Sequence, residues 1–194
     1  MKVIDHIKNA KETLFSIEVL PPQKGRKIEH LYNILDPLME FKPPFVDVTY
    51  HREEIQYKKN LDGSIARIPL RKRPGTVGIC AAIMNKYQID AVPHLICGGF
   101  TKEETEDALF SLYYLGIENV LIIKGDEMGK SEYHMEDMVN RNIYAIDLVD
   151  QVKKMNNGVF CHEETAYEMS TDFCMGVAGY PEKHFEAPNL NTDL

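Results

Sequence analysis

The stretch AVPHLICGGFTKEETEDALFSLYYLGIENVLIIKGD (Ala91–Asp126) decides the predicted fold. Its two ends, Ala91–Cys97 and Asn119–Asp126, are short apolar runs that are typical of buried strands. Between them, Thr101 and Glu104 have the spacing of a helix capping box, and a glycine ends the helix that they begin. A strand, a helix and a second strand in this order predict a right-handed crossover between parallel strands.

The same alternation extends over most of the chain. Three further segments are rich in apolar and β-branched residues and are predicted as strands, namely Thr13–Leu20, Phe45–His51 and Phe173–Tyr180. Apolar residues recur at helical spacing in residues 28–41, which predicts a helix there. A short polar helix is predicted at residues 4–11, and further helices at 77–87 and 143–155. Strands that alternate with helices predict an α/β fold, in which helices cover a parallel sheet.

Two sheet architectures fit this alternation. No GxGxxG or GxxxxGK[ST] motif follows a predicted strand, so the phosphate signature of open nucleotide-binding sheets is missing. Several strands instead end in polar residues, and in a (βα)8 barrel those ends form the active-site mouth. We therefore expect a TIM-type barrel, with about five of its eight βα units present in one partial domain over residues 1–194.

Composition excludes several classes of protein. The formal net charge of −8 argues against a general nucleic-acid binder, and the basic cluster Arg71-Lys72-Arg73 is interpreted as a solvated loop in preference to an anion site. Apolar runs are too short for a membrane span, and the charged start does not resemble a signal peptide, so we expect a cytoplasmic protein. The four cysteines form no CxxC pair and are expected to be reduced thiols without a metal.

Two carboxylates and three other side chains are candidates for chemistry. Glu18 is flanked by apolar residues in a strand, and burial of a carboxyl group raises its pKa and suits it to general acid catalysis. A side chain exposed at the barrel rim is an equally good interpretation. Asp126 at a strand end could bind a ligand or only cap a turn, and His94 could be a ligand or a core residue. Tyr180 and His184 offer rings that suit a flat cofactor or surface packing.

Six segments in the same order resemble the methylenetetrahydrofolate reductase family over nearly the whole chain. They are Phe15-Ser-Ile-Glu-Val-Leu-Pro-Pro22, Val46-Asp-Val-Thr-Tyr50, Pro93-His-Leu-Ile-Cys97, Ile122-Ile-Lys-Gly-Asp126, Tyr144-Ala145 before Asp147-Leu148, and Gly176-Val-Ala-Gly-Tyr-Pro-Glu-Lys-His184. Each segment alone is weak evidence. Together they imply a (βα)8 barrel that binds FAD at its mouth and reduces 5,10-methylenetetrahydrofolate to 5-methyltetrahydrofolate, in the one-carbon metabolism that serves methionine synthesis.

The resemblance also implies roles for individual residues. NADH or NADPH and the folate would use the same face of the flavin in turn, with ping-pong kinetics. Glu18 matches the general acid that protonates N10 of the folate, so that its five-membered ring opens to a cation that accepts hydride. Asp126 matches the aspartate beside flavin and pterin, which stabilises that cation. The flavin contacts implied by the resemblance are Thr49, Tyr50, His94, Ile123, Lys124, Gly125, Asp126, Tyr144, Ala145, Tyr180, His184, Ala187 and Asp193.

Three features depart from the family pattern. Lys124 stands where many relatives have arginine, which keeps the charge but loses the planar fork. The segment Arg52–Pro74 is longer than in compact bacterial members; contact of Lys58, Lys59 or Arg71 with the acidic tail of folate is one interpretation, and a solvated loop is the favoured one. Further flavin, folate and nicotinamide contacts of the family would follow Leu194, so we expect weak or no activity from this chain alone.

Other functions stay open at this point. A non-catalytic flavin-binding or interaction module is the alternative from a different class, and another TIM-barrel lyase or hydrolase is the alternative within enzymes. A metal-dependent hydrolase would need several strand-end ligands, and only His94 is well placed. A lysine aldolase would need a lysine within a strand, and only Lys124 qualifies. Unpaired sheet edges favour self-association, so we expect a homo-oligomer.

Overall fold

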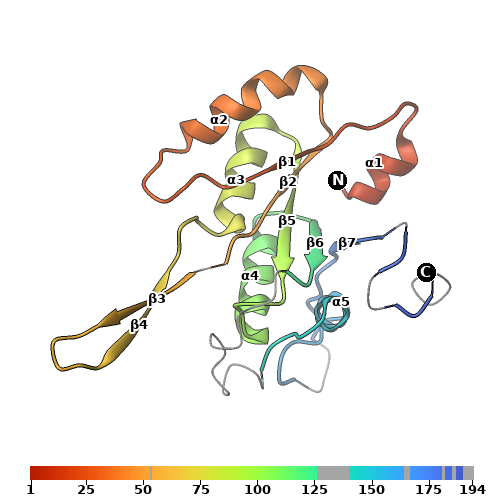
Figure 1. The fold of residues 1–194 in the computed structure, drawn as a ribbon. Helices are drawn as coiled ribbons and strands as arrows, with labels where there is room; N and C mark the ends of the chain where they lie inside the picture. Colours follow the sequence, from red (N-terminus) through yellow and green to blue (C-terminus); the bar gives the residue numbers. More distant parts are fainter. Residues whose placement is uncertain (53, 126–139, 164–166, 181, 185–186, 190–194) are drawn as a thin grey trace.

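The structure is a computed structural model that describes residues 1–52, 54–125, 140–163, 167–180, 182–184 and 187–189. Its centre is a five-stranded sheet with the strand order β1-β2-β5-β6-β7, in which every neighbouring pair is parallel (Figure 1). The strands are β1 (Ile17–Val19), β2 (Phe45–Val48), β5 (Asp90–Ile96), β6 (Asn119–Ile123) and β7 (Cys174–Val177). All five predicted strands and the predicted α/β class are confirmed, and the sheet is open, with β1 and β7 at its edges.

Helices lie at the predicted places, the first before β1 and the other four between successive strands of the sheet. They are α1 (Val3–Asn9), α2 (Glu29–Leu35), α3 (Thr76–Tyr87), α4 (Lys102–Tyr114) and α5 (Ala145–Asn156). The capping box of α4 is confirmed, since the Glu104 N–H donates to Thr101 Oγ1 at 3.1 Å and the Thr101 N–H donates to Glu104 Oε2 at 2.8 Å. None of the helices in the described ranges is both long and apolar enough to cross a bilayer.

The second predicted helix is interrupted. Residues 28–41 were expected to form one helix, but α2 ends at Leu35 and the 3₁₀ helix η1 (Asp36–Phe41) follows it. Pro37 explains the change, because proline has no N–H for the α-helical hydrogen bond and its ring crowds the preceding turn.

The segment between β2 and α3 differs from the prediction of a solvated loop. It is exposed, but it folds into an antiparallel hairpin of β3 (Glu54–Lys59) and β4 (Ile65–Leu70), which projects from the body of the molecule (Figure 1). The turn is made by Asn60–Ser64: the Asn60 N–H donates to the Ser64 carbonyl at 2.8 Å, and Gly63 has a φ of +86°. Left-handed backbone of this kind favours glycine, so Asp62-Gly63 is the sequence signal for the hairpin.

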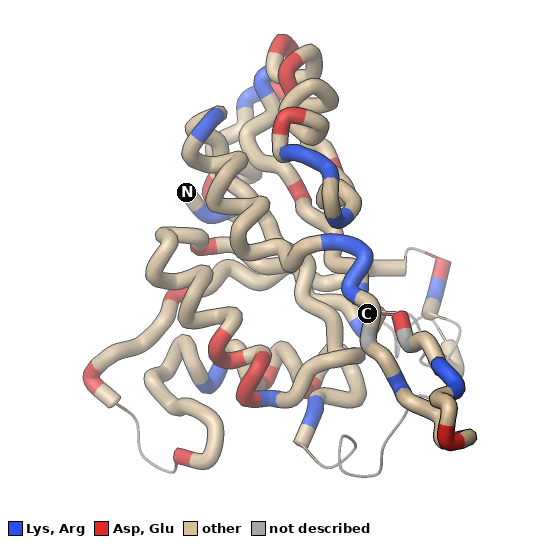
Figure 2. The backbone as a smooth tube through the Cα atoms, turned by 90° about the vertical axis from the view of Figure 1, so that its left-hand side faces the viewer, with Lys and Arg blue, Asp and Glu red and all other residues tan. Residues whose placement is uncertain are grey.

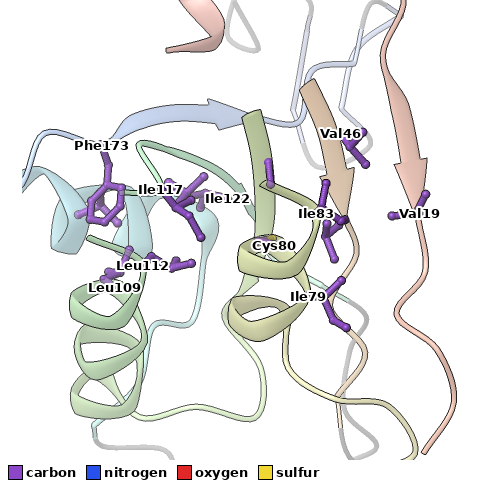
Figure 3. Close-up of a cluster of buried hydrophobic side chains, with 14 of the residues drawn as sticks. Val19, Val46, Ile79, Cys80, Ile83, Leu109, Leu112, Ile117, Ile122 and Phe173 are labelled. Atoms are coloured by element: carbon purple, nitrogen blue, oxygen red, sulfur yellow. The ribbon is translucent and has the colours of Figure 1, made fainter. Parts of the chain in front are cut away.

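The parallel register gives the two faces of the sheet different chemistry. Glu18 pairs with Asp47 and Val19 with Val48, and paired residues of neighbouring strands point to the same face. One face is apolar and packs against α3 and α4 (Figure 3). The opposite face carries polar side chains at several positions. The apolar face is formed by buried residues that include Val19, Val46, Val48, Ala91, Val120 and Ile122.

The core lies between this apolar face and the helices. Leu109 and Leu112 of α4 and Ile83 of α3 are fully buried there (Figure 3). Full burial of a leucine side chain stabilises the fold by roughly 1.5–3 kcal/mol relative to its exposure. The helix-covered face therefore supplies the apolar burial that holds the strands in place.

We predict that Leu112→Ala lowers the free energy of unfolding by about 2–5 kcal/mol, because it leaves a cavity at a side chain with 0% exposure. Leu61→Ala is the matched control, since the Leu61 side chain is fully exposed at the hairpin turn and its loss is expected to change stability by less than about 0.5 kcal/mol. Urea denaturation followed by circular dichroism measures both. Equal destabilisation by the two variants would contradict this location of the core.

Candidate active site at the strand ends

Three side chains meet on the polar face of the sheet, and we name Glu18, Asp47 and His94 the strand-end cluster. His94 Nε2 lies 3.8 Å from Glu18 Oε2 and 3.8 Å from Asp47 Oδ1. The strands β1, β2 and β5 position them side by side, since Glu18 pairs with Asp47 and Asp47 with Val92, two residues before His94. Two carboxylates therefore flank one imidazole.

The members of the cluster differ in exposure. The His94 side chain is 6% exposed and that of Asp47 is 19% exposed, whereas that of Glu18 is 61% exposed. The sequence allowed either a buried or an exposed Glu18, and the structure shows an exposed one. The residues that the structure describes therefore do not supply the desolvation that would suit Glu18 to general acid catalysis.

His94 has an unpartnered polar atom. Its Nε2 is buried and has no hydrogen-bond partner in the described part of the chain, because both carboxylates stand beyond hydrogen-bond distance. An unsatisfied buried polar atom costs about 1–3 kcal/mol. A ligand that offered a hydrogen bond to this nitrogen would offset that cost.

Asp47 was not singled out from the sequence. Its signal was the alternation in Phe45–Thr49, which places Asp47 on the face opposite to buried Val46 and Val48. The functional interest of the position becomes visible only when the register places Asp47 between Glu18 and His94.

Thr49 and Tyr50 extend the site beyond the end of β2. The Thr49 N–H donates to the Val19 carbonyl at 3.0 Å, and its Oγ1 donates to the same oxygen at 3.3 Å. Tyr50 makes an edge-on contact with Phe100, with ring centroids 5.0 Å apart. Tyr50 and His94 both line a small pocket of about 120 Å³. The structure therefore brings these two predicted flavin contacts to one place.

The end of β6 meets the start of α5. Lys124 Nζ lies 5.3 Å from the centroid of the Tyr144 ring, which is within the range of a cation–π contact. Tyr144 directly precedes α5, and Ala145 is the first residue of that helix. Asp147 Oδ2 accepts hydrogen bonds from the Tyr144 N–H at 2.8 Å and the Ile143 N–H at 3.0 Å, which fixes this turn.

Tyr180, His184 and Ala187 form a separate group after β7. The Tyr180 and His184 rings are edge-on with centroids 4.8 Å apart. Lys183 Nζ donates to the Ala187 carbonyl at 2.6 Å, which closes the loop. Asp126 and Asp193, the other two predicted site residues, lie outside the described residues, so their roles stay predictions.

The two buried thiols, Cys97 after β5 and Cys80 in the core on α3, are poor candidates for a nucleophile. Burial raises the pKa of the Cys97 thiol to about 11, and its Sγ donates to the Ile123 carbonyl at 3.6 Å. Burial also raises the pKa of Cys80 strongly. A raised pKa keeps a thiol protonated at neutral pH, and the protonated form is a poor nucleophile and a poor metal ligand. Within the described residues, no group of three His, Cys, Asp or Glu side chains has the geometry to hold a metal ion.

The family model of methylenetetrahydrofolate reductase matches residues 2–194. The chain belongs to the methylenetetrahydrofolate reductase family. Among its relatives is methylenetetrahydrofolate reductase (NADH) 1 of Arabidopsis thaliana, which is 28% identical over 198 residues. The 5,10-methylenetetrahydrofolate reductase of Escherichia coli is 28% identical over 182 residues, and methylenetetrahydrofolate reductase 1 of Schizosaccharomyces pombe is 27% identical over 198.

These alignments cover nearly all of this chain but only part of each relative. The matched region is 99% of this chain and 28% of the Arabidopsis protein, and 92% of this chain and 48% of the Escherichia coli protein. The chain therefore spans about half the length of the bacterial relatives and less of the plant and yeast ones. The resemblance seen in the sequence is confirmed at the level of the family, and the open parallel sheet agrees with part of the family's TIM-barrel domain.

Gly125 is one of the positions in this methylenetetrahydrofolate reductase family member where the backbone conformation favours glycine. Its φ is +77°, and an added Cβ would lie 3.2 Å from Ile96 Cβ. The close approach of the two strand ends, β5 at Ile96 and β6 at Ile123, would make a side chain at this point a tight contact with Ile96.

We predict that Gly125→Ala lowers the free energy of unfolding more than Gly116→Ala does. Both glycines have left-handed backbone, with φ of +77° and +72°, which costs an L-residue about 1–2 kcal/mol. Gly116 has open space around its Cβ position, so only Gly125 adds a steric contact, worth about 1 kcal/mol or more. Chemical denaturation of both variants measures the difference. Equal losses would show that the contact with Ile96 relaxes without cost.

Proposed function

We propose that this chain supplies part of a flavin-dependent reductase that converts 5,10-methylenetetrahydrofolate to 5-methyltetrahydrofolate, with NADH or NADPH as electron donor. The proposal rests on the strand-end cluster in a chain of this family, because Glu18 and His94 meet at the strand ends, 3.8 Å apart. The relatives are named as reductases of methylenetetrahydrofolate, which supports the proposal, and the Arabidopsis relative is named for NADH. We further propose that residues 1–194 belong to one barrel domain and that the product serves methionine synthesis.

The proposed proton donor is Glu18. Its carboxyl group is exposed on the polar face, so a folate that lay there would contact it directly and remove it from water. Asp47 Oδ1 lies 3.8 Å from His94 Nε2, and this carboxylate would orient the His94 imidazole toward the ligand. Asp126 is proposed to stabilise positive charge on the substrate, as the resemblance implies.

The residues that are described fit a bound FAD. His94 Nε2 offers a buried hydrogen-bonding atom that has no partner among the described residues. Lys124 and Tyr144 add a cation and a ring at the end of β6. When bound, FAD would carry electrons from the nicotinamide nucleotide to the folate. The proposed binding residues are Thr49, Tyr50, His94, Ile123, Lys124, Gly125, Tyr144, Ala145, Tyr180, His184 and Ala187, with Asp126 and Asp193 outside the described residues.

We predict that the purified chain, after incubation with FAD and desalting, retains less than one FAD per chain, as measured by its visible absorbance. The open sheet provides the strand-end residues, but β1 and β7 are its edge strands in the described structure. The mouth is therefore open on both sides, and we expect weak flavin binding. Anaerobic NADH then bleaches whatever flavin is held in a productive site. A retained spectrum that NADH and NADPH both fail to bleach would favour the alternative of a non-catalytic flavin-binding module. Size-exclusion chromatography of the same sample tests the proposed homo-oligomer.

We predict that Glu18→Gln slows folate reduction by about 10²–10⁴-fold in the catalytically competent protein, because general acid catalysis contributes a factor of that size. Reduction of the flavin by NADH needs no proton from this side chain and is expected to keep its rate. Stopped-flow spectroscopy measures the two half-reactions separately. Glu12→Gln is the matched control, since Glu12 is exposed and precedes β1. Equal loss in both half-reactions would assign Glu18 to flavin binding and not to proton transfer.

A further inference from the structure

We propose that a polar pocket between α4 and α5 binds a free α-amino acid with an apolar side chain, through its ammonium and its carboxylate group. The pocket has a volume of about 600 Å³, and its lining comes from the start of α4, the turn before α5, one face of α5 and residues 159–163. Pockets for small molecules measure roughly 300–1,000 Å³, so a whole amino acid fits. Glu18, Asp47 and His94 do not line it, so the inference is independent of the proposed function.

The deciding observation is a buried oxygen atom in the lining. Asn142 lines the pocket and is 3% exposed, and its Oδ1 has no hydrogen-bond partner in the part of the chain that the structure describes. An unsatisfied buried polar atom costs about 1–3 kcal/mol. A ligand that donated a hydrogen bond to this oxygen would offset that cost.

A relay of two side-chain amides determines which atom of Asn142 is left unpartnered. Gln151 Nε2 donates to the Lys102 carbonyl at 2.6 Å, and a carbonyl can only accept, so Gln151 Oε1 is the acceptor end of its amide. Asn142 Nδ2 donates to that Oε1 at 2.6 Å. Asn142 therefore has its oxygen, and not an N–H, beyond the end of the relay. Only a ligand with an N–H or O–H donor suits this position.

Carboxylates on α5 favour a donor that carries positive charge. Asp147, Asp150, Gln151 and Lys154 all line the pocket, and their spacing of three and four residues places them on one face of the helix. Hydrogen bonds between an ammonium group and a carboxylate are roughly twice as strong as those between neutral groups. An ammonium group that donated to Asn142 Oδ1 would also have the carboxylates of this face as counter-charges.

Lysines of the same pocket require a second, negative group on the ligand. Lys102 lies at the start of α4, and Lys154 follows Asp150 by four residues, roughly 6 Å along the axis of α5. A purely cationic ligand would be repelled by these lysines and a purely anionic one by the carboxylates, whereas a zwitterion pairs with both. Figure 2 shows that basic and acidic residues are interspersed along much of the backbone. What distinguishes this pocket is the buried acceptor beside the two charges.

The wall opposite α5 is held in place by hydrogen bonds to α4. The Cys161 N–H donates to Glu106 Oε2 at 2.6 Å, and His162 Nε2 lies 2.9 Å from Glu103 Oε1. These contacts fix the segment after α5 against α4, so the pocket is formed before a ligand binds. Val159 and Phe160 in this segment are half-buried and line the pocket, which gives an apolar side chain of the ligand a surface to contact.

The test follows the side-chain NH₂ signals of Asn142 and Gln151 in ¹H–¹⁵N spectra of the 194-residue chain during titration with L-leucine to millimolar concentrations. Saturable shifts of both signals are expected. Two analogues of the same shape are the ligand controls. L-leucinamide keeps the ammonium group without the carboxylate, and 4-methylpentanoate keeps the carboxylate without the ammonium group. Each is expected to bind at least about tenfold more weakly than L-leucine, which corresponds to about 1.4 kcal/mol.

Two variants assign the charged partners. Asp150→Asn is expected to weaken L-leucine at least about tenfold, and Asp107→Asn, an exposed change on α4 outside the pocket, is its matched control.

Lys102→Gln/Lys154→Gln is expected to weaken L-leucine to a similar degree and to leave L-leucinamide unaffected, because that ligand has no carboxylate to lose a partner. Lys58→Gln/Lys59→Gln removes two charges from exposed positions of β3 and is its control. Circular dichroism confirms that each variant is folded.

Four outcomes would overturn the proposal. An absence of shifts with L-leucine would leave a bound water as the partner of Asn142 Oδ1. Equally tight binding of L-leucinamide would make the pocket a cation site, and equally tight binding of 4-methylpentanoate would make it an anion site. Equal weakening by pocket and control variants would place the binding elsewhere. The assay contains no flavin and no folate, so failure of the reductase proposal leaves its result unchanged.

Discussion

The parallel hydrogen-bond register between β1, β2 and β5 is the constraint on which the rest of the structure depends. It pairs Glu18 with Asp47 and Val19 with Val48, so that each pair points to one face. A shift of one residue in β1 would exchange the faces of Glu18 and Val19, bringing a carboxylate against the helices and a valine to the polar face. Burial of Val19, Val46 and Val48 opposes such a shift, and the same apolar packing that stabilises the sheet therefore aligns the strand-end cluster.

Local signals explain how much of the fold the sequence predicts. Apolar runs define the five strands, and the capping box of Thr101 and Glu104 defines the start of α4, because both depend on neighbours in the chain. The hairpin of β3 and β4 escaped prediction, since its strands are exposed and lack a buried stripe that would show in the pattern. Pro37 was visible in the sequence, but whether the chain breaks there or continues as a 3₁₀ helix depends on packing around Leu35.

The positions of several candidate residues in the strands were predictable from the sequence, but their arrangement was not. Glu18, Thr49 and His94 stand at strand ends, which the sequence places there without a structure. The approach of Asp47 to His94 depends on the register between two strands that are separated by the whole hairpin and α3. Exposure of Glu18 depends on what covers the polar face, and no local pattern determines that. The apolar residues beside Glu18 in the sequence suggested that its carboxyl group is removed from water, but the structure shows the side chain exposed. Only a ligand on the polar face would remove it from water.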